Sequence, residues 1–279
     1  MRGPTFQMPD EGPPSLGVIP KGLDSQPSLL QTRISTIYPH QPIGKHIRFR
    51  CEADDGQTYH CKSDADGRPI RANEWISQSL ALHLGIAVPD FRIMEDRDGE
   101  TYFGSHEHIR TASPFKLEDL LTRCTAANEL GGPAGPLSWL GPRLSGLYAL
   151  DMFLNNNDRN LRNFVLLEDT VPNVLCAIDF ADARLEDITS DRFPVAGSHT
   201  VCNGKFVESL HGFSLDTALE MIDNIWDIRV SVIDRIIGGM PSDWMVDDQK
   251  QQIRGAWADN RLGARLSALR AGLEDGSRR

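Results

Sequence analysis

The residue pattern changes near residue 104, and this change constrains the fold more than any other feature of the chain. Before it, short runs rich in β-branched and aromatic residues predict strands, and a helix with one apolar face interrupts them at about Ala72 to Leu84. The five expected strands are Arg33–Tyr38, Ile47–Glu52, Thr58–Lys62, Phe91–Glu95 and Thr101–Gly104. This order predicts an antiparallel sheet with one helix packed on it, which is an α+β unit.

The second half of the chain has a mostly helical pattern. Leu144–Leu154 predicts a strong helix, because its apolar residues recur at intervals of three and four. A hairpin is expected next, at Phe164–Leu167 and Leu175–Ile178. The other expected helical stretches are Leu117–Cys124, Asp216–Gly238 and Gln249–Leu273.

Three regions follow from these patterns. Residues 1–32 are rich in Pro, Gly, Ser and Gln and are expected to form a disordered or loosely docked arm. Residues 33–108 are expected to form the sheet lobe. Residues 109–279 are expected to form a helical lobe that contains the loop after the Leu144–Leu154 helix.

Composition excludes several classes of partner. The 279 residues carry a formal net charge of −10, which disfavours broad binding to nucleic acid or to an anionic membrane. No apolar run reaches transmembrane length and no signal peptide is visible, so a cytoplasmic location is expected. The five cysteines are scattered, which disfavours a disulfide framework or a zinc ribbon. Cys61 and Cys176 are expected to act as small apolar residues inside strands.

An Asn-rich loop between the predicted helix and hairpin carries the residues that indicate chemistry. It runs from Asn155 to Asn163 and contains Asp158, and the hairpin leads directly to Asp179. Asp158 is suited to handle the proton of an attacking hydroxyl, while Asn163 and Asp179 supply the oxygens that hold Mg²⁺ on ATP. The pattern therefore predicts a phosphotransferase with ATP and Mg²⁺ as cofactors.

A simple polar turn is the alternative interpretation of this loop. Asn and Asp favour turns because their side chains bond to the nearby backbone. The Asp-x-x-x-x-Asn spacing alone is also common by chance. The Asp179–Phe180 pair at the right distance, and the helix–loop–hairpin context, favour the catalytic interpretation.

The loop from Asp158 to Asn163, together with Ile178–Asp179–Phe180, resembles the catalytic and metal-binding loops of the HipA-like kinases. A more distant similarity links both loops to the phosphoinositide kinases. In the first half, a strand ending in a lysine is followed by Asn73–Glu74–Trp75 at a helix start and then by Leu84–Pro89, which is similar to the order in the HipA-like kinase domain. The resemblance covers about residues 35–250.

The resemblance implies a two-lobed protein-kinase-like fold, with ATP between the sheet lobe and the helical lobe, and a protein Ser or Thr hydroxyl as acceptor. Lys62 matches the strand lysine that contacts the α- and β-phosphates, and Glu74 matches the helix glutamate that pairs with it. Taken alone, Lys62 resembles a solvated lysine at a strand end, and Glu74 a carboxylate favoured by a helix start. Lys45 is the alternative lysine.

Several positions depart from the pattern of the relatives. No Gly-rich phosphate loop is present, and the segment expected to cover the phosphates, His40–His46, has one glycine. Asn160 stands where the relatives often have His, and Ala181 replaces the Gly of Asp-Phe-Gly. Asp182 adds a carboxylate close to the expected metal position, where it either supports the metal ligands or is simply exposed, and exposure is favoured. Two alternative functions therefore stay open: a kinase-fold nucleotide-binding protein without turnover, and a small-molecule kinase.

Other polar and aromatic residues are expected to have supporting roles. Asp151, on the helix before the loop, is interpreted as a structural hydrogen-bonding residue. His106–His108 lies where a linker between lobes is expected, so its backbone is a candidate to face adenine. Trp226, Trp244 and Trp257 are expected to lie in the core and packing of the C-terminal helices.

Overall fold

The computed structural model describes residues 31–39, 46–108, 110–118, 121, 139–168 and 174–279. Nearly all of the predicted arm lies outside these residues, as do the segment from His40 to Lys45 and most of the helix predicted at Leu117–Cys124. No described helix is both long and apolar enough to cross a membrane.

The first half forms the five predicted strands and one helix, with ends within a few residues of those expected. The strands are β1 (Thr32–Tyr38), β2 (Ile47–Ala53), β3 (Thr58–Lys62), β4 (Phe91–Glu95) and β5 (Thr101–His106). They pair in the order β1-β2-β3-β5-β4, and each neighbouring pair in this order is antiparallel.

The sheet also closes on itself, which corrects the expectation of a purely antiparallel sheet. β1 pairs with β4 in parallel through Thr32 opposite Met94 and Arg33 opposite Glu95, so the five strands form a barrel. Cys51, Cys61 and Met94 are fully buried in a small apolar cluster of the strands. A side chain at Gly104 would overlap Met94, with a Cβ only 2.3 Å from its Cγ, so this position requires glycine.

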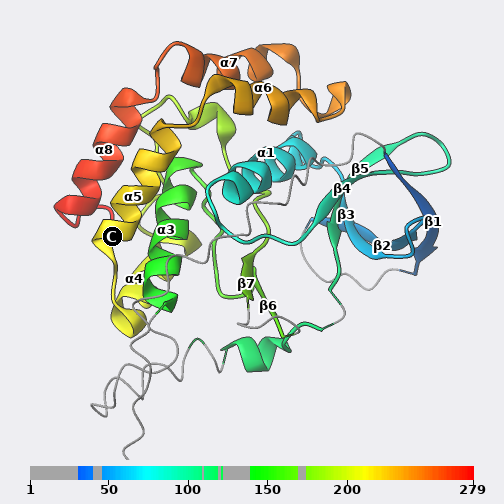
Figure 1. Cartoon of the computed structure of the whole chain (residues 1–279), viewed down its shortest axis with the longest axis horizontal. Helices are drawn as coiled ribbons and strands as arrows, with labels where there is room; N and C mark the ends of the chain where they lie inside the picture. Colours follow the sequence, from blue (N-terminus) through cyan, green and yellow to red (C-terminus); the bar gives the residue numbers. More distant parts are fainter. Residues whose placement is uncertain (1–30, 40–45, 109, 119–120, 122–138, 169–173) are drawn as a thin grey trace, which may run out of the picture.

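The helix α1 (Ile70–His83) joins the barrel to the rest of the chain. Its apolar face is buried with residues of β4 and β5, and the ring of Trp75 packs edge-on against Phe91, with ring centroids 5.3 Å apart. Trp75 also donates from Nε1 to the carbonyl of Ile236, at 2.9 Å. α1 is therefore fixed to helical residues far along the chain, as Figure 1 shows.

In the described residues of the second half, one hairpin and six α-helices can be followed from their first residue to their last. The hairpin is β6 (Phe164–Leu167) and β7 (Val174–Ala177). The helices are α3 (Leu140–Phe153), α4 (His199–His211), α5 (Leu215–Trp226), α6 (Val230–Gly238), α7 (Asp247–Ala258) and α8 (Gly263–Glu274), and single 3₁₀ turns occur at Leu185–Asp187 and Ser242–Trp244. Residues 114–118 are also helical.

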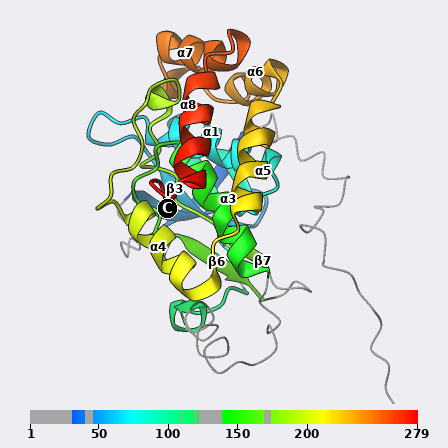
Figure 2. The same cartoon turned by 90° about the vertical axis from the view of Figure 1, so that its left-hand side faces the viewer.

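α3 lies at the centre of the helical part, packed against α4, α5 and α8, and nearly all of its residues are buried (Figures 1 and 2). It begins four residues before the predicted Leu144, because Pro142 falls in its first turn, where proline is tolerated. α4 was not predicted. The two long stretches predicted after it are each divided into two helices, with breaks at residues 227–229 and 259–262.

The tryptophans differ from their predicted common role. Trp244 is buried, but its ring faces Trp75 of α1 at 6.2 Å, and its Nε1 donates to Thr101 Oγ1 of β5 at 2.8 Å. It therefore joins the C-terminal helices to the barrel. Trp226 is 46% exposed, so its predicted burial is wrong. Cys61 and Cys176 are buried within β3 and β7, as predicted.

Candidate active site

The Asn-rich loop begins with a sharp turn at the end of α3. Asn155 adopts φ of 49°, a left-handed conformation that Asn tolerates better than most residues. Its side-chain amide donates to Asp187 Oδ2 at 2.8 Å, which connects the turn to the segment that follows β7. The loop therefore leaves α3 in a fixed direction and returns into β6.

A buried arginine organises the loop from within, and the sequence analysis did not single it out. Arg159 donates from Nε to Asp151 Oδ2 at 2.8 Å and from Nη2 to Asp151 Oδ1 at 3.1 Å. Its Nη1 donates to the carbonyls of Asn163 and Ile178, and its guanidinium lies 4.5 Å from the ring centroid of Phe180. Arg159 thus joins the Asp158 loop to the Asp179 segment, and Asp151 is the structural hydrogen-bonding residue that was predicted.

The predicted catalytic and metal-binding residues of the loop are connected directly. Asn163 donates from Nδ2 to the carbonyl oxygen of Asp158 at 2.7 Å, which fixes the direction of its amide group. The backbone carbonyl of Asn163 accepts from the backbone N–H of Ile178 at 3.0 Å, and Ile178 directly precedes Asp179. Among the described residues, Asn163 Oδ1 accepts no hydrogen bond, so it is available as an oxygen ligand.

Lys62 meets both predicted carboxylates. Its Nζ lies 2.5 Å from Glu74 Oε1 and 2.8 Å from Asp179 Oδ1, so it joins β3, α1 and the segment after β7. Gln78 supports the pair from one turn along α1, donating to Glu74 Oε2 at 2.8 Å. Lys62 and Glu74 are buried, whereas the Asp179 side chain is 27% exposed.

The close contact shifts the pKa of both titrating partners. Burial alone would lower the pKa of the Lys62 ammonium, but the Glu74 and Asp179 carboxylates outweigh it and the pKa is raised. Burial alone would raise the pKa of the Asp179 carboxyl, but Lys62 outweighs it and lowers that pKa to about 2. Asp179 also adopts φ of 60°, a conformation uncommon for a non-glycine residue and enriched at functional sites.

The segment after Asp179 is tied to the barrel side of the site. Asn73 of α1 donates from Nδ2 to the carbonyls of Ala181 and Ala183, at 3.3 and 2.8 Å. Asp182 is paired with Arg68 and lies 3.7 Å from His46 Nε2, so the prediction that it is simply exposed is wrong. Burial holds the pKa of His46 below its ordinary value, against the opposing effect of the nearby carboxylates.

An imidazole beside the predicted catalytic carboxylate comes from outside the loop. His199, the first residue of α4, places Nδ1 2.5 Å from Asp158 Oδ1. Asn160, in the loop itself, donates to the backbone carbonyl of Asp158 instead. No local pattern in the sequence indicates the contact of His199, because it joins residues 41 positions apart.

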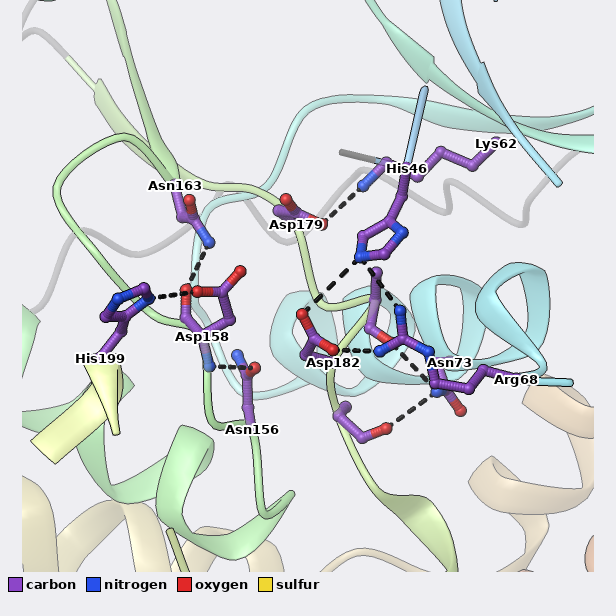
Figure 3. A network of polar contacts seen from close by, with 12 residues as sticks. His46, Lys62, Arg68, Asn73, Asn156, Asp158, Asn163, Asp179, Asp182 and His199 are labelled. Carbon is purple, nitrogen blue, oxygen red and sulfur yellow. Dashed lines mark hydrogen bonds and ion pairs between the residues drawn. The ribbon is translucent and has the colours of Figure 1, made fainter. Parts of the chain in front are cut away.

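Figure 3 shows how these groups lie relative to one another. Asp158, Asn163 and Asp179 come from neighbouring loops of the helical part, and Lys62 reaches Asp179 from the barrel. All five predicted site residues therefore fall into two connected groups: Lys62 with Glu74 and Asp179, and Asp158 with Asn163. The alternative lysine, Lys45, lies outside the described residues.

Comparison with known sequences supports the resemblance in the first half of the chain. Residues 34–112 match the sequence model of a family described as HipA-like kinase. The match covers the barrel and α1, with Lys62 and Glu74, and ends before the Asp158 loop. No protein in a curated collection matches the chain.

Comparison with solved structures shows a kinase-like fold. The proinflammatory kinase CtkA from Helicobacter pylori superposes with a TM-score of 0.52 at 12% identity, over 86% of this chain and 96% of CtkA. The Golgi casein kinase with Mn/ADP bound gives 0.46 at 12% identity, over 87% and 74%. HipA of the Shewanella oneidensis MR-1 toxin–antitoxin system gives 0.41 at 11% identity, over 85% and 65%. Of these three structures, CtkA is similar enough to support the fold, and the predicted α+β, kinase-like class is confirmed at that coarse level.

Proposed function

We propose that the chain is an ATP- and Mg²⁺-dependent phosphotransferase that transfers the γ-phosphoryl group of ATP to an alcohol, with a protein Ser or Thr side chain as the acceptor. The observation that carries the proposal is the position of Lys62, which bridges Glu74 and Asp179 beside the loop of Asp158 and Asn163. A strand lysine paired with a helix glutamate, beside a separate metal-binding aspartate, is the arrangement that positions nucleotide phosphates in protein kinases.

The oxygens of Asn163 and Asp179 fit a magnesium ion. The amide of Asn163 is oriented by its donation to Asp158, which leaves Oδ1 available, and Asp179 engages Lys62 through Oδ1, which leaves Oδ2. No cluster of three or more His, Cys, Asp or Glu side chains suited to a metal occurs in the described part of the chain, so further ligands must come from phosphate and water. When bound, Mg²⁺ neutralises charge on the β- and γ-phosphates.

Lys62 is suited to contact the phosphates because Asp179, one of its two partners, can share the ammonium with another anion. Glu74 is fully buried and holds the lysine from α1, while Asp179 lies at the partly open side. A phosphate oxygen at this position would share the ammonium with Asp179, which is then free to bind metal. Lys62 would thus hold the α- and β-phosphates, and Glu74 would keep it in place.

Asp158 is the group proposed to act on the acceptor. The acceptor O–H bond breaks as a new O–P bond forms, the proton passes to a carboxylate oxygen of Asp158, and the bond from the γ-phosphorus to the ADP oxygen breaks. Removal of a proton by a positioned side chain contributes roughly 10²- to 10⁴-fold to a rate. The backbone of Asp158 is fixed for this purpose by Asn156, Asn160 and Asn163.

Substitution of Asp158 tests the proposal. Asp158→Ala should lower phosphoryl transfer at least about 100-fold, measured with radiolabelled ATP on the chain itself and on a whole-cell protein extract. The affinity for Mg²⁺–ATP, measured by calorimetry, should stay within about threefold, because Lys62, Asn163 and Asp179 are unchanged. Full activity of Asp158→Ala would remove Asp158 from the mechanism. Binding of ATP by the wild-type chain with no labelled product would favour the nucleotide-binding alternative.

A further inference from the structure

The carboxylate of Asp158 has one side-chain partner in the described part of the chain. The backbone of Asp158 is held at its N–H by Asn156 and at its carbonyl by Asn160 and Asn163, but none of these contacts reaches the carboxylate. The carboxylate is 31% exposed, and only His199 Nδ1, at 2.5 Å from Oδ1, fixes its orientation. Without this contact the two oxygens would be free to rotate.

His199 is held in place by its buried neighbour. Thr200 is fully buried, and its Oγ1 accepts from the N–H of Arg159 at 3.0 Å and donates to the carbonyl of Asn156 at 2.5 Å. Ser198 caps the same helix end by accepting from the N–H of Val201. The first residues of α4 are thus bonded to the loop on both sides of Asp158, and the contact of His199 is not that of a free surface side chain.

The chemistry of the two groups fixes the direction of the hydrogen bond. A carboxylate oxygen accepts and does not donate, so Nδ1 of His199 carries the hydrogen in this contact. The imidazole is 66% exposed, and the contact occupies only Oδ1 of the carboxylate. The other oxygen, Oδ2, stays available to the acceptor.

We propose that His199 is a positioning residue for Asp158: its Nδ1–H holds Oδ1, so that Oδ2 faces the acceptor hydroxyl and takes its proton. This inference rests on the proposed phosphotransferase function. In Figure 3, His199 reaches Asp158 from α4, whereas Asn163 reaches it from the loop itself. The orientation of the carboxylate therefore depends on the correct placement of α4 against the loop.

Three variants of the full chain test the inference. His199→Ala removes the donor, whereas His199→Asn keeps an amide N–H at the position of Nδ1. Lys205→Ala changes an exposed residue of the same helix and serves as the matched control. Transfer from radiolabelled ATP is measured with dephosphorylated casein and with the chain itself as acceptors, and thermal unfolding is followed for each variant.

His199→Ala should lower kcat roughly 10- to 100-fold, the loss expected for a misplaced catalytic group, with an unchanged KM for ATP and an unchanged Tm. His199→Asn should recover most of the lost rate, and Lys205→Ala should match the wild type. Wild-type rates for His199→Ala, or an equal loss in His199→Asn, would overturn the role of His199. No transfer by the wild-type chain would instead overturn the proposed function, and this inference with it.

A second measurement detects the contact itself without activity. Two-bond proton–nitrogen correlation NMR, assigned with His199→Asn, should show His199 protonated at Nδ1 in the wild type. The signals should move toward the Nε2-protonated form in Asp158→Ala. Identical His199 signals in the two proteins would show that the contact does not form in solution, and would overturn the inference.

Discussion

Arg159 lies within the Asp158 loop and Lys62 lies beside it, and the two cations differ in how fully the protein itself supplies their hydrogen-bond partners. Arg159 is 2% exposed, and its guanidinium makes four hydrogen bonds, two of them to Asp151 and two to backbone carbonyls. Lys62 has two carboxylate partners, and one of them, Asp179, is 27% exposed. Both cations are buried, but only Lys62 has a partner that is partly exposed to solvent.

This difference separates a structural cation from the one that is proposed to bind phosphate. The planar fork of Arg159 bonds to the Asp151 carboxylate through two donors, and two further donors bond to the carbonyls of Asn163 and Ile178. Four of the five N–H donors of this buried guanidinium are therefore already used within the protein. In the proposed function, Lys62 would share its ammonium between Asp179 and a phosphate oxygen, which leaves no buried charge unpaired. The Asp158–Arg159 dipeptide thus combines a residue proposed for chemistry with one that holds the loop together.

The largest expected effect on the free energy of unfolding comes from a substitution of Arg159. Arg159→Met should lower the free energy of unfolding by about 3–5 kcal/mol, because it leaves the buried charge of Asp151 without its partner. Urea unfolding followed by circular dichroism measures the loss. Arg162→Met, in an exposed arginine of the same loop, is the matched control and should be close to neutral.

A double variant separates the lost charge pair from lost packing. Asp151→Asn removes the unpaired charge but keeps an oxygen for the side-chain amide of Asn156. The Asp151→Asn/Arg159→Met protein should therefore regain part of the stability lost by Arg159→Met alone. If Arg159→Met is as stable as Arg162→Met, the distinction between the two cations fails.

Much of the fold could be predicted because its signals are local. Each strand of the barrel is bounded by turn residues such as Asp54–Asp55–Gly56, and the alternation of side chains identifies it. Closure of the barrel could not be predicted, since it depends on only two residue pairs between β1 and β4, about sixty positions apart. The register of such a short parallel contact is set by packing.

Helix α4, which was not predicted, forms because a tertiary contact outweighs the low helix propensity of one of its residues. Gly204 lies in its interior, where glycine is disfavoured, and it interrupts the apolar pattern. The structure explains it: a Cβ at Gly204 would lie 2.4 Å from the ring of Tyr148, so glycine allows α4 to approach α3 closely. The Ser198 cap was a local signal for the helix start.

The candidate site also has one part that local motifs predict and another part that depends on tertiary contacts. Lys62, Glu74, Asn163 and Asp179 were selected from motifs. The structure pairs Lys62 with Glu74 as expected, and it also brings Lys62 against Asp179 and Asn163 against Asp158, while the roles of these residues stay predictions. The side chains that contact Asp158 and Arg159 could not be predicted from the sequence. Both His199 and Asp151 join the loop through contacts that no sequence spacing encodes.

An intermediate effect on the free energy of unfolding is expected from the pair of Lys62 and Asp179, and this effect depends on pH. The pKa of Asp179 is about 2 in the folded chain against an ordinary value of 3.8. A lowered pKa contributes stability that is fully present above about pH 5 and is lost as the pH falls toward 2. The contribution amounts to about 2 kcal/mol, and roughly half of it should be lost by about pH 3.

Asp179→Asn isolates this contribution, because it removes the charge and keeps the shape. Unfolding free energies of the wild type and the variant, measured in urea with EDTA present, should differ by about 2 kcal/mol at pH 6. The difference should shrink steadily between pH 5 and pH 3. A difference that does not change over this range would mean that the pair of Lys62 and Asp179 is not formed in the free protein.

The smallest effect is expected from a third cation, which extends the comparison to the surface. Arg68 pairs with Asp182 on the segment after Asp179, with side-chain exposures of 34% and 19%. Water competes for both groups, so the pair should contribute less than about 1 kcal/mol. Asp182→Asn should therefore change the midpoint of urea unfolding only slightly, and transfer to casein should stay within about threefold of the wild type. A loss as large as that of Arg159→Met would show that burial does not decide which cations hold this loop, because the most exposed of the three would then be as important as the most buried one.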